Sequence, residues 1–386
     1  MKLLVDGVFF SLSRSGITRV WTTLLQRLVS FPDLEVILLD RGGCPALAGI
    51  ELIEFPSYTM NSLNAHDSLL LDEFGQKLRA DVFISTYYTT PVSLPSVLMV
   101  HDMIPEALGF DLSLRPWREK QIAISYARYF ACVSEATRRD LVRFYPETRD
   151  RAVVTHCGVE RQIFRAREER EIEEFKARFG ISKPYYLLVG ARQQAHGYKN
   201  GALVFRAASS LNELACEILC VGGEKLADET LRGLPANVSA RRIDLSDEEL
   251  ALGYAGAEAL LYPSLYEGFG LPVVEAMACG CPVISTADGS LGEVCGGAAL
   301  TISGREEKEL AWAMRRVREP GARKQLVESG RARAAQYDWD TMARAVHTLL
   351  QQACEEGRTA EAREFFRSWK KLRTIQAAVD IFDPID

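Results

Sequence analysis

The sequence lacks several features that would assign it to a specialised class of protein. Its 386 residues contain no apolar run of the roughly 18 residues that a membrane-spanning helix needs. No two of its nine cysteines are separated by two residues, and no two of its five histidines stand four residues apart. These absences argue against a transmembrane helix and against a zinc or other metal site, and we assign no metal.

The sequence also has no excess of basic residues over acidic ones. Lys and Arg number 46 against 52 Asp and Glu, which gives a formal net charge of -6 and disfavours a general nucleic-acid binder. The odd number of cysteines, most of them in apolar runs such as Phe130–Val133, indicates buried thiols and a reducing compartment. The chain turns acidic at Asp6, sooner than a signal peptide would. We expect a cytoplasmic protein, and peripheral contact with the inner face of a membrane stays open.

Short apolar runs recur at intervals that leave room for a helix between them. Apolar residues in Ile17–Leu28, for example, follow the spacing of one helix face. Buried runs that alternate with helices predict an α/β fold with parallel sheets. The runs are Leu3–Val5, Val36–Leu39, Val82–Ser85, Val97–Val100, Phe130–Val133, Val153–Thr155, Tyr185–Val189, Ile218–Val221, Ala259–Tyr262, Val283–Ser285 and Ala299–Ile302.

A highly charged stretch, Arg161–Phe179, interrupts this alternation once. We therefore predict two doubly wound parallel-sheet domains, residues 1–165 and 166–353, followed by a helical tail, residues 354–386. The tail carries the stripe Phe365–Ile375, and we favour packing on its own protein, on the N-terminal domain, over a membrane anchor. Because parallel sheets bind ligands beyond the carboxyl ends of their strands, a site is expected in a cleft between the two domains.

The densest signal is the segment EGFGLPVVEAMACG, residues 267–280, directly after a predicted strand. Two glycines give a tight turn with exposed amides, Pro272 suits the start of a helix, and Gly280 suits its end. Glu275 then falls in the first helical turn, where the helix dipole favours an anion. Such a loop offers amide hydrogens to a charged ligand and two carboxylates to its hydroxyls.

In combination, these residues resemble the E-x7-E signature of retaining glycosyltransferases of the GT-B fold, in particular glycosyltransferase family 4. The resemblance covers most of the chain. It implies two Rossmann-like domains that face each other across a cleft, with the acceptor on the first and the nucleotide sugar on the second. The matching segments are Ser15–Ile17, Val100–Asp102, Val133–Glu135, Arg192 with Lys199–Asn200, Ser246–Leu250, Glu267–Gly280 and Tyr337–Trp339.

The resemblance also implies catalytic roles. Arg192 and Lys199 stabilise the charge that develops on the leaving diphosphate, without a metal or other cofactor. Glu267 lies near the donor sugar and stabilises positive charge at the anomeric carbon rather than acting as a covalent nucleophile. His101 hydrogen-bonds the donor sugar. The segment Gln193–His196 looks like an insertion relative to the family's usual spacing.

A second set of residues binds the donor in the implied site. Glu275 holds the ribose hydroxyls, since a carboxylate accepts two vicinal hydroxyls together. The remaining donor-binding residues are the close-approach glycine Gly16, the base-pocket residue Leu245, and the amides of Gly268, Phe269, Gly270 and Leu271.

Several side chains keep two interpretations. Asp102 either orients the acceptor or caps the next segment, and Ser246 with Glu249 suffices as a plain capping box. Arg241 and Arg242 either reach the base or face water. The cluster Arg138, Arg139 and Arg143 is a solvated face or a contact for an anionic or lipid-linked acceptor.

These features predict a retaining, metal-independent hexosyltransferase. It transfers a sugar from UDP-glucose or a related UDP-hexose, with GDP-mannose next, to a hydroxyl of a glycan or lipid-linked oligosaccharide during polysaccharide synthesis. A nucleotide-sugar epimerase on the same fold would need further acid and base residues, and none is evident. A non-catalytic protein that binds a nucleotide sugar is a third interpretation. An NAD dehydrogenase is disfavoured because no G-x-G-x-x-G follows Leu3–Val5.

Overall fold

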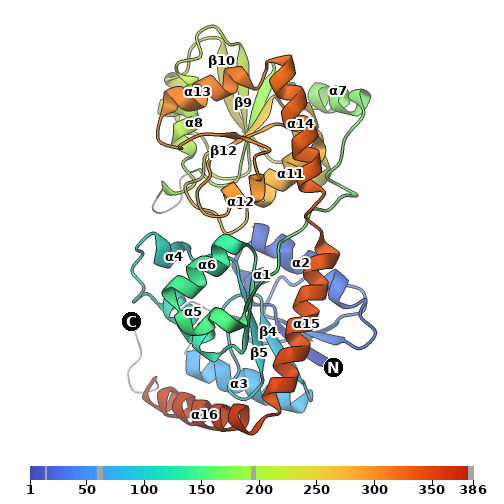
Figure 1. The fold of residues 1–386 in the computed structure, drawn as a ribbon, viewed down its shortest axis with the longest axis vertical. Coiled ribbons are helices and arrows are strands. Elements are labelled where there is room, and N and C mark those ends of the chain that lie inside the picture. The colour runs from blue at the N-terminus through green and yellow to red at the C-terminus, as the bar shows by residue number, and fades with distance from the viewer. Residues whose placement is uncertain (14, 59–63, 193–196, 381–386) are drawn as a thin grey trace. The chain divides into compact units, whose positions relative to one another are not determined.

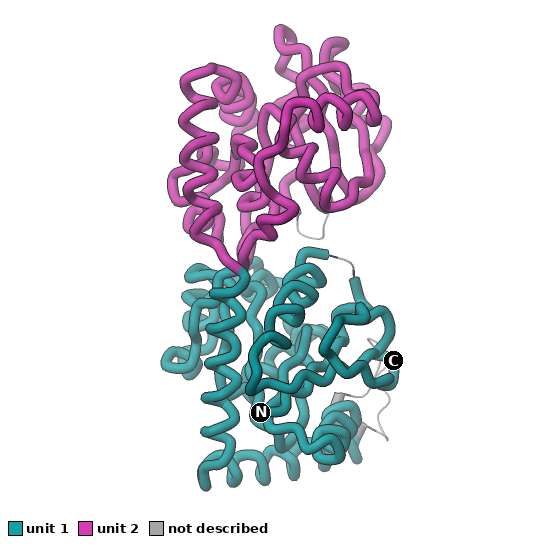
Figure 2. The backbone as a smooth tube through the Cα atoms, turned by 90° about the vertical axis from the view of Figure 1, so that its right-hand side faces the viewer, with its two compact units in different colours: residues 1–156, 339–386 teal, residues 157–338 magenta. Residues whose placement is uncertain are grey.

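The computed structural model describes residues 1–13, 15–58, 64–192 and 197–380. It divides the chain into two compact units, which Figure 2 shows in different colours. Unit 1 comprises Met1–His156 with Trp339–Asp386, and unit 2 comprises Cys157–Asp338.

Unit 1 is built on a seven-stranded parallel sheet with the order β3-β2-β1-β4-β5-β6-β7. The central strands are apolar and buried, as strands covered on both faces must be. The strands are β1 (Lys2–Asp6), β2 (Glu35–Asp40), β3 (Glu51–Glu54), β4 (Val82–Ser85), β5 (Ser96–Val100), β6 (Tyr129–Cys132) and β7 (Ala152–Val154).

Helices cover both faces of this sheet (Figure 1). On one face α15 packs against α2 and against β4, β5 and β6. On the other face α3, α5 and α6 contribute to the apolar core. The helices are α1 (Val8–Leu12), α2 (Gly16–Leu28), α3 (Asn64–Lys77), α4 (Ile104–Ala107), α5 (Arg115–Tyr126), α6 (Glu135–Phe144), the 3-10 helix Pro146–Arg151, α15 (Trp339–Gly357) and α16 (Ala360–Asp380).

Unit 2 repeats this architecture with a six-stranded parallel sheet of order β10-β9-β8-β11-β12-β13. One face is covered by α8 and α13, whose apolar residues share a core with the strands, and α10 and α11 pack together with α7 and α14. The strands are β8 (Tyr185–Val189), β9 (Cys216–Val221), β10 (Val238–Ile243), β11 (Ala259–Tyr262), β12 (Val283–Ser285) and β13 (Leu300–Thr301). The helices are α7 (Glu169–Arg178), α8 (Gly201–Ala208), α9 (Asp228–Arg232), α10 (Asp247–Gly256), α11 (Leu271–Cys279), α12 (Leu291–Cys295), α13 (Glu307–Arg316) and α14 (Pro320–Ala334).

The predicted fold class is confirmed: the chain forms two doubly wound parallel sheets. Every predicted apolar run overlaps a strand, and the helical pattern from Ile17 is α2. Two strands, β3 and β10, were not predicted, and both lie at the edge of a sheet. Edge strands are covered incompletely, so β3 carries glutamates at both ends and β10 carries two arginines instead of a continuous apolar run.

The boundaries of the units correct the predicted ones at residues 165 and 353. Residues from Cys157 onward belong to unit 2, where the Arg161 guanidinium donates to the Ala335 carbonyl at 2.7 Å. The chain returns to unit 1 at Trp339, because the apolar face of α15 is buried against α2 and the sheet of unit 1. The tail helix α16 packs on α3, and the ring of Phe366 lies 5.9 Å from that of Tyr126.

Candidate active site

Two charged residues of unit 2, Lys199 and Glu267, lie at the point where the strand order of its sheet reverses. The chain runs outward from β8 to β9 and β10, then returns to begin β11 on the other side of β8. Lys199 lies in the loop after β8, and Glu267 lies in the loop after β11. Loops at the carboxyl ends of such neighbouring strands form the usual ligand site of doubly wound folds.

Lys199 and Glu267 form a direct ion pair there. The Lys199 ammonium donates to both carboxylate oxygens of Glu267, at 2.7 Å and 2.8 Å. Glu267 is 7% exposed, and Lys199 retains partial access to solvent. The ammonium also lies 6.0 Å from the centre of the Tyr262 ring. Burial, with the Glu267 carboxylate beside the phenol, raises the pKa of Tyr262 well above its usual value.

Main-chain contacts hold the loop of Lys199 against the loop of Glu267. Asn200, the next residue, adopts a left-handed conformation with φ +54°. Its side-chain amide donates to the carbonyls of Pro263, at 3.1 Å, and Gly304, at 2.7 Å. The amide of Leu265 donates to the carbonyl of Tyr198 at 2.8 Å. The backbone of the Lys199 loop is therefore held by the segments that follow β11 and β13.

The backbone around Glu267 is held as well. The Ser290 hydroxyl donates to the carbonyls of Glu267 and Phe269, both at 2.9 Å. Gly289 has φ +60°, and a Cβ there would lie 2.9 Å from the backbone nitrogen of Glu267. A larger residue at Gly289 would displace Glu267, so the glycine is required by close packing.

The motif after Glu267 leads into α11. Gly270 precedes the helix with φ +101°, and Gly280 ends it with φ +78°. The helix begins at Leu271, so Glu275 is in its second turn, not in the first turn as predicted, and the helix dipole contributes little to it. Glu275 is 2% exposed. The ring of Phe269 packs edge-on against Tyr337, with centroids 5.3 Å apart.

Arg192 follows β8, and its side chain contacts the loop after β9. Its guanidinium Nη1 donates to the carbonyl of Gly222 at 2.9 Å, and its backbone amide donates to the Glu224 carboxylate at 2.8 Å. Both partners follow β9, and Arg192 and Glu224 line a cavity of about 60 Å³. Its buried Nη2 has no hydrogen-bond partner among the described residues. The predicted insertion, residues 193–196, lies outside the described residues.

The polar side chains around β10 are engaged by neighbouring residues. Arg241 donates to the Glu217 carboxylate at 2.7 Å, and Arg242 forms two hydrogen bonds to Asp244, at 2.8 Å and 2.6 Å. Ser246 and Glu249 form the capping box of α10. Leu245, just before this box, is half-buried.

In unit 1, His101 follows β5 and is buried. Its Nε2 accepts a hydrogen bond from the indole Nε1 of Trp21, on α2, at 3.2 Å. Burial lowers the pKa of His101 to about 4, so the ring is neutral near neutral pH. Gly16 is the first residue of α2. Asp102 caps the segment that follows, since its carboxylate accepts from the Ile104 amide at 3.0 Å.

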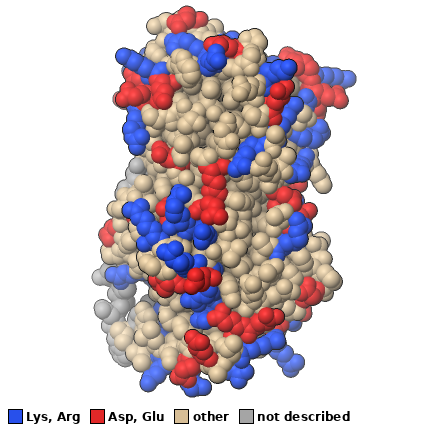
Figure 3. Space-filling view, in the orientation of Figure 1, with Lys and Arg blue, Asp and Glu red and all other residues tan. Residues whose placement is uncertain are grey.

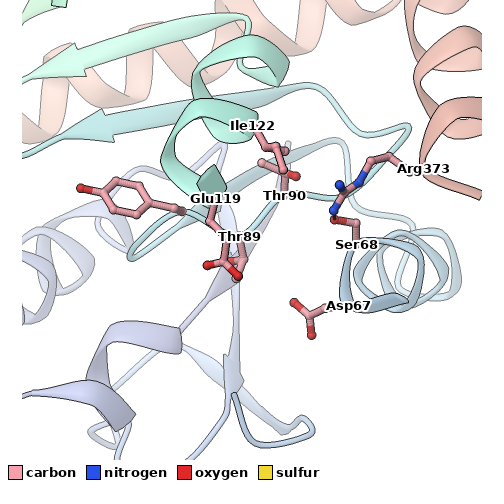
Figure 4. A pocket seen from close by; sticks show the side chains of 8 residues that line it. Asp67, Ser68, Thr89, Thr90, Glu119, Ile122 and Arg373 are labelled. Atoms are coloured by element: carbon pink, nitrogen blue, oxygen red, sulfur yellow. Dashed lines mark hydrogen bonds between the residues drawn. The ribbon is translucent and has the colours of Figure 1, made fainter. Parts of the chain in front are cut away.

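A further polar cluster in unit 1 was not predicted from the sequence. The Arg41 guanidinium, buried beyond the end of β2, donates to Asp6 at 2.7 Å and to Asp67 at 2.8 Å. Figure 4 shows the neighbouring polar cavity, where Arg373 of α16 points toward Ser68, which accepts from it at 3.0 Å. The cavity measures about 10 Å³, enough for one water molecule. No composition or motif signals these partners, because they are far apart in the sequence.

Within the described ranges, no group of three or more His, Cys, Asp or Glu side chains is arranged to hold a metal ion. All nine cysteines are free thiols.

Together, the fold and this charged edge define a two-unit, doubly wound α/β protein with a candidate anion site on its second sheet. Comparison with known proteins names the class. Residues 14–162 match the model of Glycosyltransferase Family 4, and residues 183–319 match that of Glycosyl transferases group 1. The chain belongs to this family of glycosyltransferases.

Curated relatives share a low sequence identity with the chain, and only part of each aligns with it. The chain is 25% identical over 56% of its length to the O-antigen chain mannosyltransferase B of Escherichia coli, of which 59% is covered. It is 29% identical over 58% of its length to the D-inositol 3-phosphate glycosyltransferase of Acidothermus cellulolyticus, of which 52% is covered. The chain thus spans little more than half the length of these relatives.

Solved structures share the fold over nearly the whole chain. Sucrose-phosphate synthase from Thermosynechococcus elongatus superposes with a TM-score of 0.73 at 18% identity, covering 91% of this chain and 98% of that one. The Anabaena protein HepE in complex with UDP-glucose gives 0.72 at 16% identity, with 91% and 100% covered. The GT-B fold that the resemblance implied is therefore confirmed.

Proposed function

We propose that the protein is a glycosyltransferase that moves a sugar from a nucleoside-diphosphate donor to a hydroxyl group. The observation that carries this function is the Lys199–Glu267 ion pair at the carboxyl edge of the unit 2 sheet. Cleavage of the glycosidic bond builds negative charge on the departing diphosphate and positive charge on the anomeric carbon. A preorganised ammonium and a preorganised carboxylate stabilise these two opposite charges where they develop.

Other residues of unit 2 complete the donor site in this proposal. Glu275 binds the ribose hydroxyls, Leu245 borders the base, and the amides of Gly268–Leu271 face the sugar and the phosphates. The Nη2 of Arg192, which has no hydrogen-bond partner among the residues that the structure describes, suits an anionic oxygen of the diphosphate. Lys199 remains the principal cation, because the Nη1 of Arg192 is already engaged by Gly222.

We infer that the reaction retains the anomeric configuration and needs no metal, because Lys199 supplies the charge that a divalent cation would otherwise supply. His101, neutral at the pH of the cytoplasm, contributes a hydrogen bond to the donor sugar rather than a proton. In this proposal the acceptor hydroxyl attacks the anomeric carbon on the same face from which the diphosphate leaves. Glu267 stabilises the oxocarbenium-like state between the two events, and the departing phosphate takes up the proton of the attacking hydroxyl.

We propose UDP-glucose or a related UDP-hexose as the donor, with GDP-mannose as the second choice. A structural neighbour was solved with UDP-glucose, and a curated relative is an O-antigen mannosyltransferase. The similarity to the O-antigen mannosyltransferase supports a growing surface glycan or lipid-linked oligosaccharide as the acceptor. The free thiols fit a cytoplasmic enzyme.

A basic surface of unit 1 supports peripheral contact with an anionic membrane. Figure 3 shows Lys and Arg side chains gathered over the part of unit 1 where Figure 1 draws α4 and α6. Arg139 and Arg143 of α6 are exposed, and Leu114, at the start of α5, is 54% exposed. Exposed arginines suit acidic headgroups, and an exposed apolar side chain of the same unit adds to such a contact. In the described part of the chain, no helix is long and apolar enough to cross a bilayer.

The test is donor turnover by the full chain. UDP-glucose, UDP-galactose and GDP-mannose are incubated in turn with the protein and a lipid-linked oligosaccharide extract, with and without EDTA, and release of the nucleoside diphosphate is measured. We expect one donor to be consumed, with no effect of EDTA and retained configuration in the product. Loss of turnover with EDTA would contradict the role given to Lys199. Interconversion of UDP-glucose and UDP-galactose without transfer would identify an epimerase instead.

A further inference from the structure

The pair formed by Trp21 and His101 has a consequence beyond packing. Trp21 lies on α2 and is fully buried, and its indole N–H donates to Nε2 of His101 at 3.2 Å. The two rings meet edge to face, with centroids 6.3 Å apart. This hydrogen bond connects α2 to the candidate catalytic residue His101, which follows β5.

The chemistry of the two rings determines where the proton of His101 resides. An indole nitrogen only donates hydrogen bonds, so Nε2 of the imidazole must act as the acceptor. A neutral imidazole carries one N–H, and when Nε2 accepts, that proton is on Nδ1. Burial keeps the ring neutral, because it lowers the pKa of His101 to about 4.

We propose that Trp21 is a positioning residue that fixes His101 as the Nδ1–H tautomer, so that the ring offers one oriented N–H to an oxygen of the donor sugar. This role rests on the proposed function, which gives His101 its sugar contact. Core packing alone would be satisfied by phenylalanine at this position. Only an indole supplies both the apolar ring and the donor that selects the tautomer.

The test combines nitrogen NMR with kinetics on the full-length protein. The ¹⁵N shifts of the His101 ring are measured in the wild type, assigned by their loss in His101→Gln, and compared in Trp21→Phe. We expect a pyrrole-like Nδ1 and a pyridine-like Nε2 in the wild type, and a mixture of tautomers in Trp21→Phe. We expect kcat to fall about 10–100-fold, as for other groups that orient a functional histidine, while KM for the donor changes by less than about threefold.

The matched control is Trp312→Phe, because Trp312 is exposed on α13 of unit 2 and should leave both readouts unchanged. A wild-type His101 with its proton on Nε2 overturns the inference, and this result does not require Trp21→Phe to fold. Unchanged shifts and an unchanged kcat in Trp21→Phe overturn it as well.

The activity of His101→Gln separates this inference from the proposed function. If that variant is inactive while Trp21→Phe changes neither the tautomer nor kcat, only the role of Trp21 fails. If His101→Gln turns over the donor as fast as the wild type, the sugar contact of His101 fails, and the role of Trp21 fails with it.

Discussion

The two units share a doubly wound architecture but treat charge differently where the winding of each sheet reverses. In unit 2, Lys199 and Glu267 form an ion pair on loops after β8 and β11, and Lys199 keeps partial access to solvent. In unit 1, the charges beyond β1 and β2 are buried, and Arg41 is saturated by Asp6 and Asp67. The candidate residue of this unit, His101 after β5, is neutral. The carboxyl edge of the sheet thus presents a partly accessible cation in unit 2 and a neutral histidine in unit 1, and the proposed function gives the first to the diphosphate and the second to a sugar hydroxyl.

The largest expected effect is the loss of the cation in unit 2. Lys199→Ala should lower kcat by about 10²–10³-fold, because one preorganised donor to a developing negative charge is worth that much. Steady-state release of the nucleoside diphosphate measures it. Lys308→Ala is the control, since Lys308 is an exposed lysine of α13 with no role in the proposed site, and it should leave kcat unchanged. Equal losses in the two variants would contradict the role given to Lys199 in unit 2.

The second expected effect concerns the neutral residue in unit 1. The pKa of His101 is about 4 in the folded chain against 6.5 for an ordinary histidine, so the unfolded chain binds more protons between these values. The stability due to neutral His101 is therefore complete above pH 6.5 and falls as the pH drops toward 4, by about 3 kcal/mol in all.

Urea unfolding between pH 7.5 and pH 4 measures this loss as the difference between the wild type and His101→Gln. The free energies of unfolding of the two proteins should converge as the pH falls, because glutamine does not titrate. Parallel curves across the whole range would show that His101 is not held neutral by burial.

The smallest expected effect tests what positions Lys199. Asn200→Gly removes the two side-chain hydrogen bonds to Pro263 and Gly304 but keeps a residue that tolerates φ +54°. It should lower the free energy of unfolding by about 1–2 kcal/mol and reduce kcat by several-fold. Asn200→Ala should be about 1 kcal/mol less stable still, because alanine is strained at this φ. Chemical denaturation distinguishes the two, and equal stabilities would argue against the left-handed conformation.

The sequence predicted the buried parts of the fold better than its edges. Central strands such as β5 and β8 are apolar throughout, so their pattern alone identifies them. The edge strands β3 and β10 carry charged residues, and nothing in their composition separates them from loops. The boundary at Trp339 was missed because an amphipathic helix does not reveal which sheet its apolar face will cover.

In the candidate site too, the sequence identified some residues but not the contacts between them. The sequence showed that Lys199 and Glu267 each follow an apolar run, but their ion pair was not predicted, because the pattern of runs does not reveal that β8 and β11 are neighbours. Trp21 reads as one more core residue of an amphipathic helix, since its hydrogen bond to His101 spans 80 positions. The orientation of Arg192 depends on the carbonyl of Gly222, which belongs to another loop. Such contacts exist only once the chain has folded.

The most direct test of the central claim is a calorimetric titration of UDP and GDP into the wild type, Lys199→Met and Lys308→Met. If Lys199 holds the diphosphate, one nucleotide should bind the wild type and Lys308→Met alike and bind Lys199→Met at least about tenfold more weakly, as expected for the loss of a charge-assisted contact. Equal affinity of all three proteins for that nucleotide would contradict the assignment of the donor site to the carboxyl edge of the unit 2 sheet.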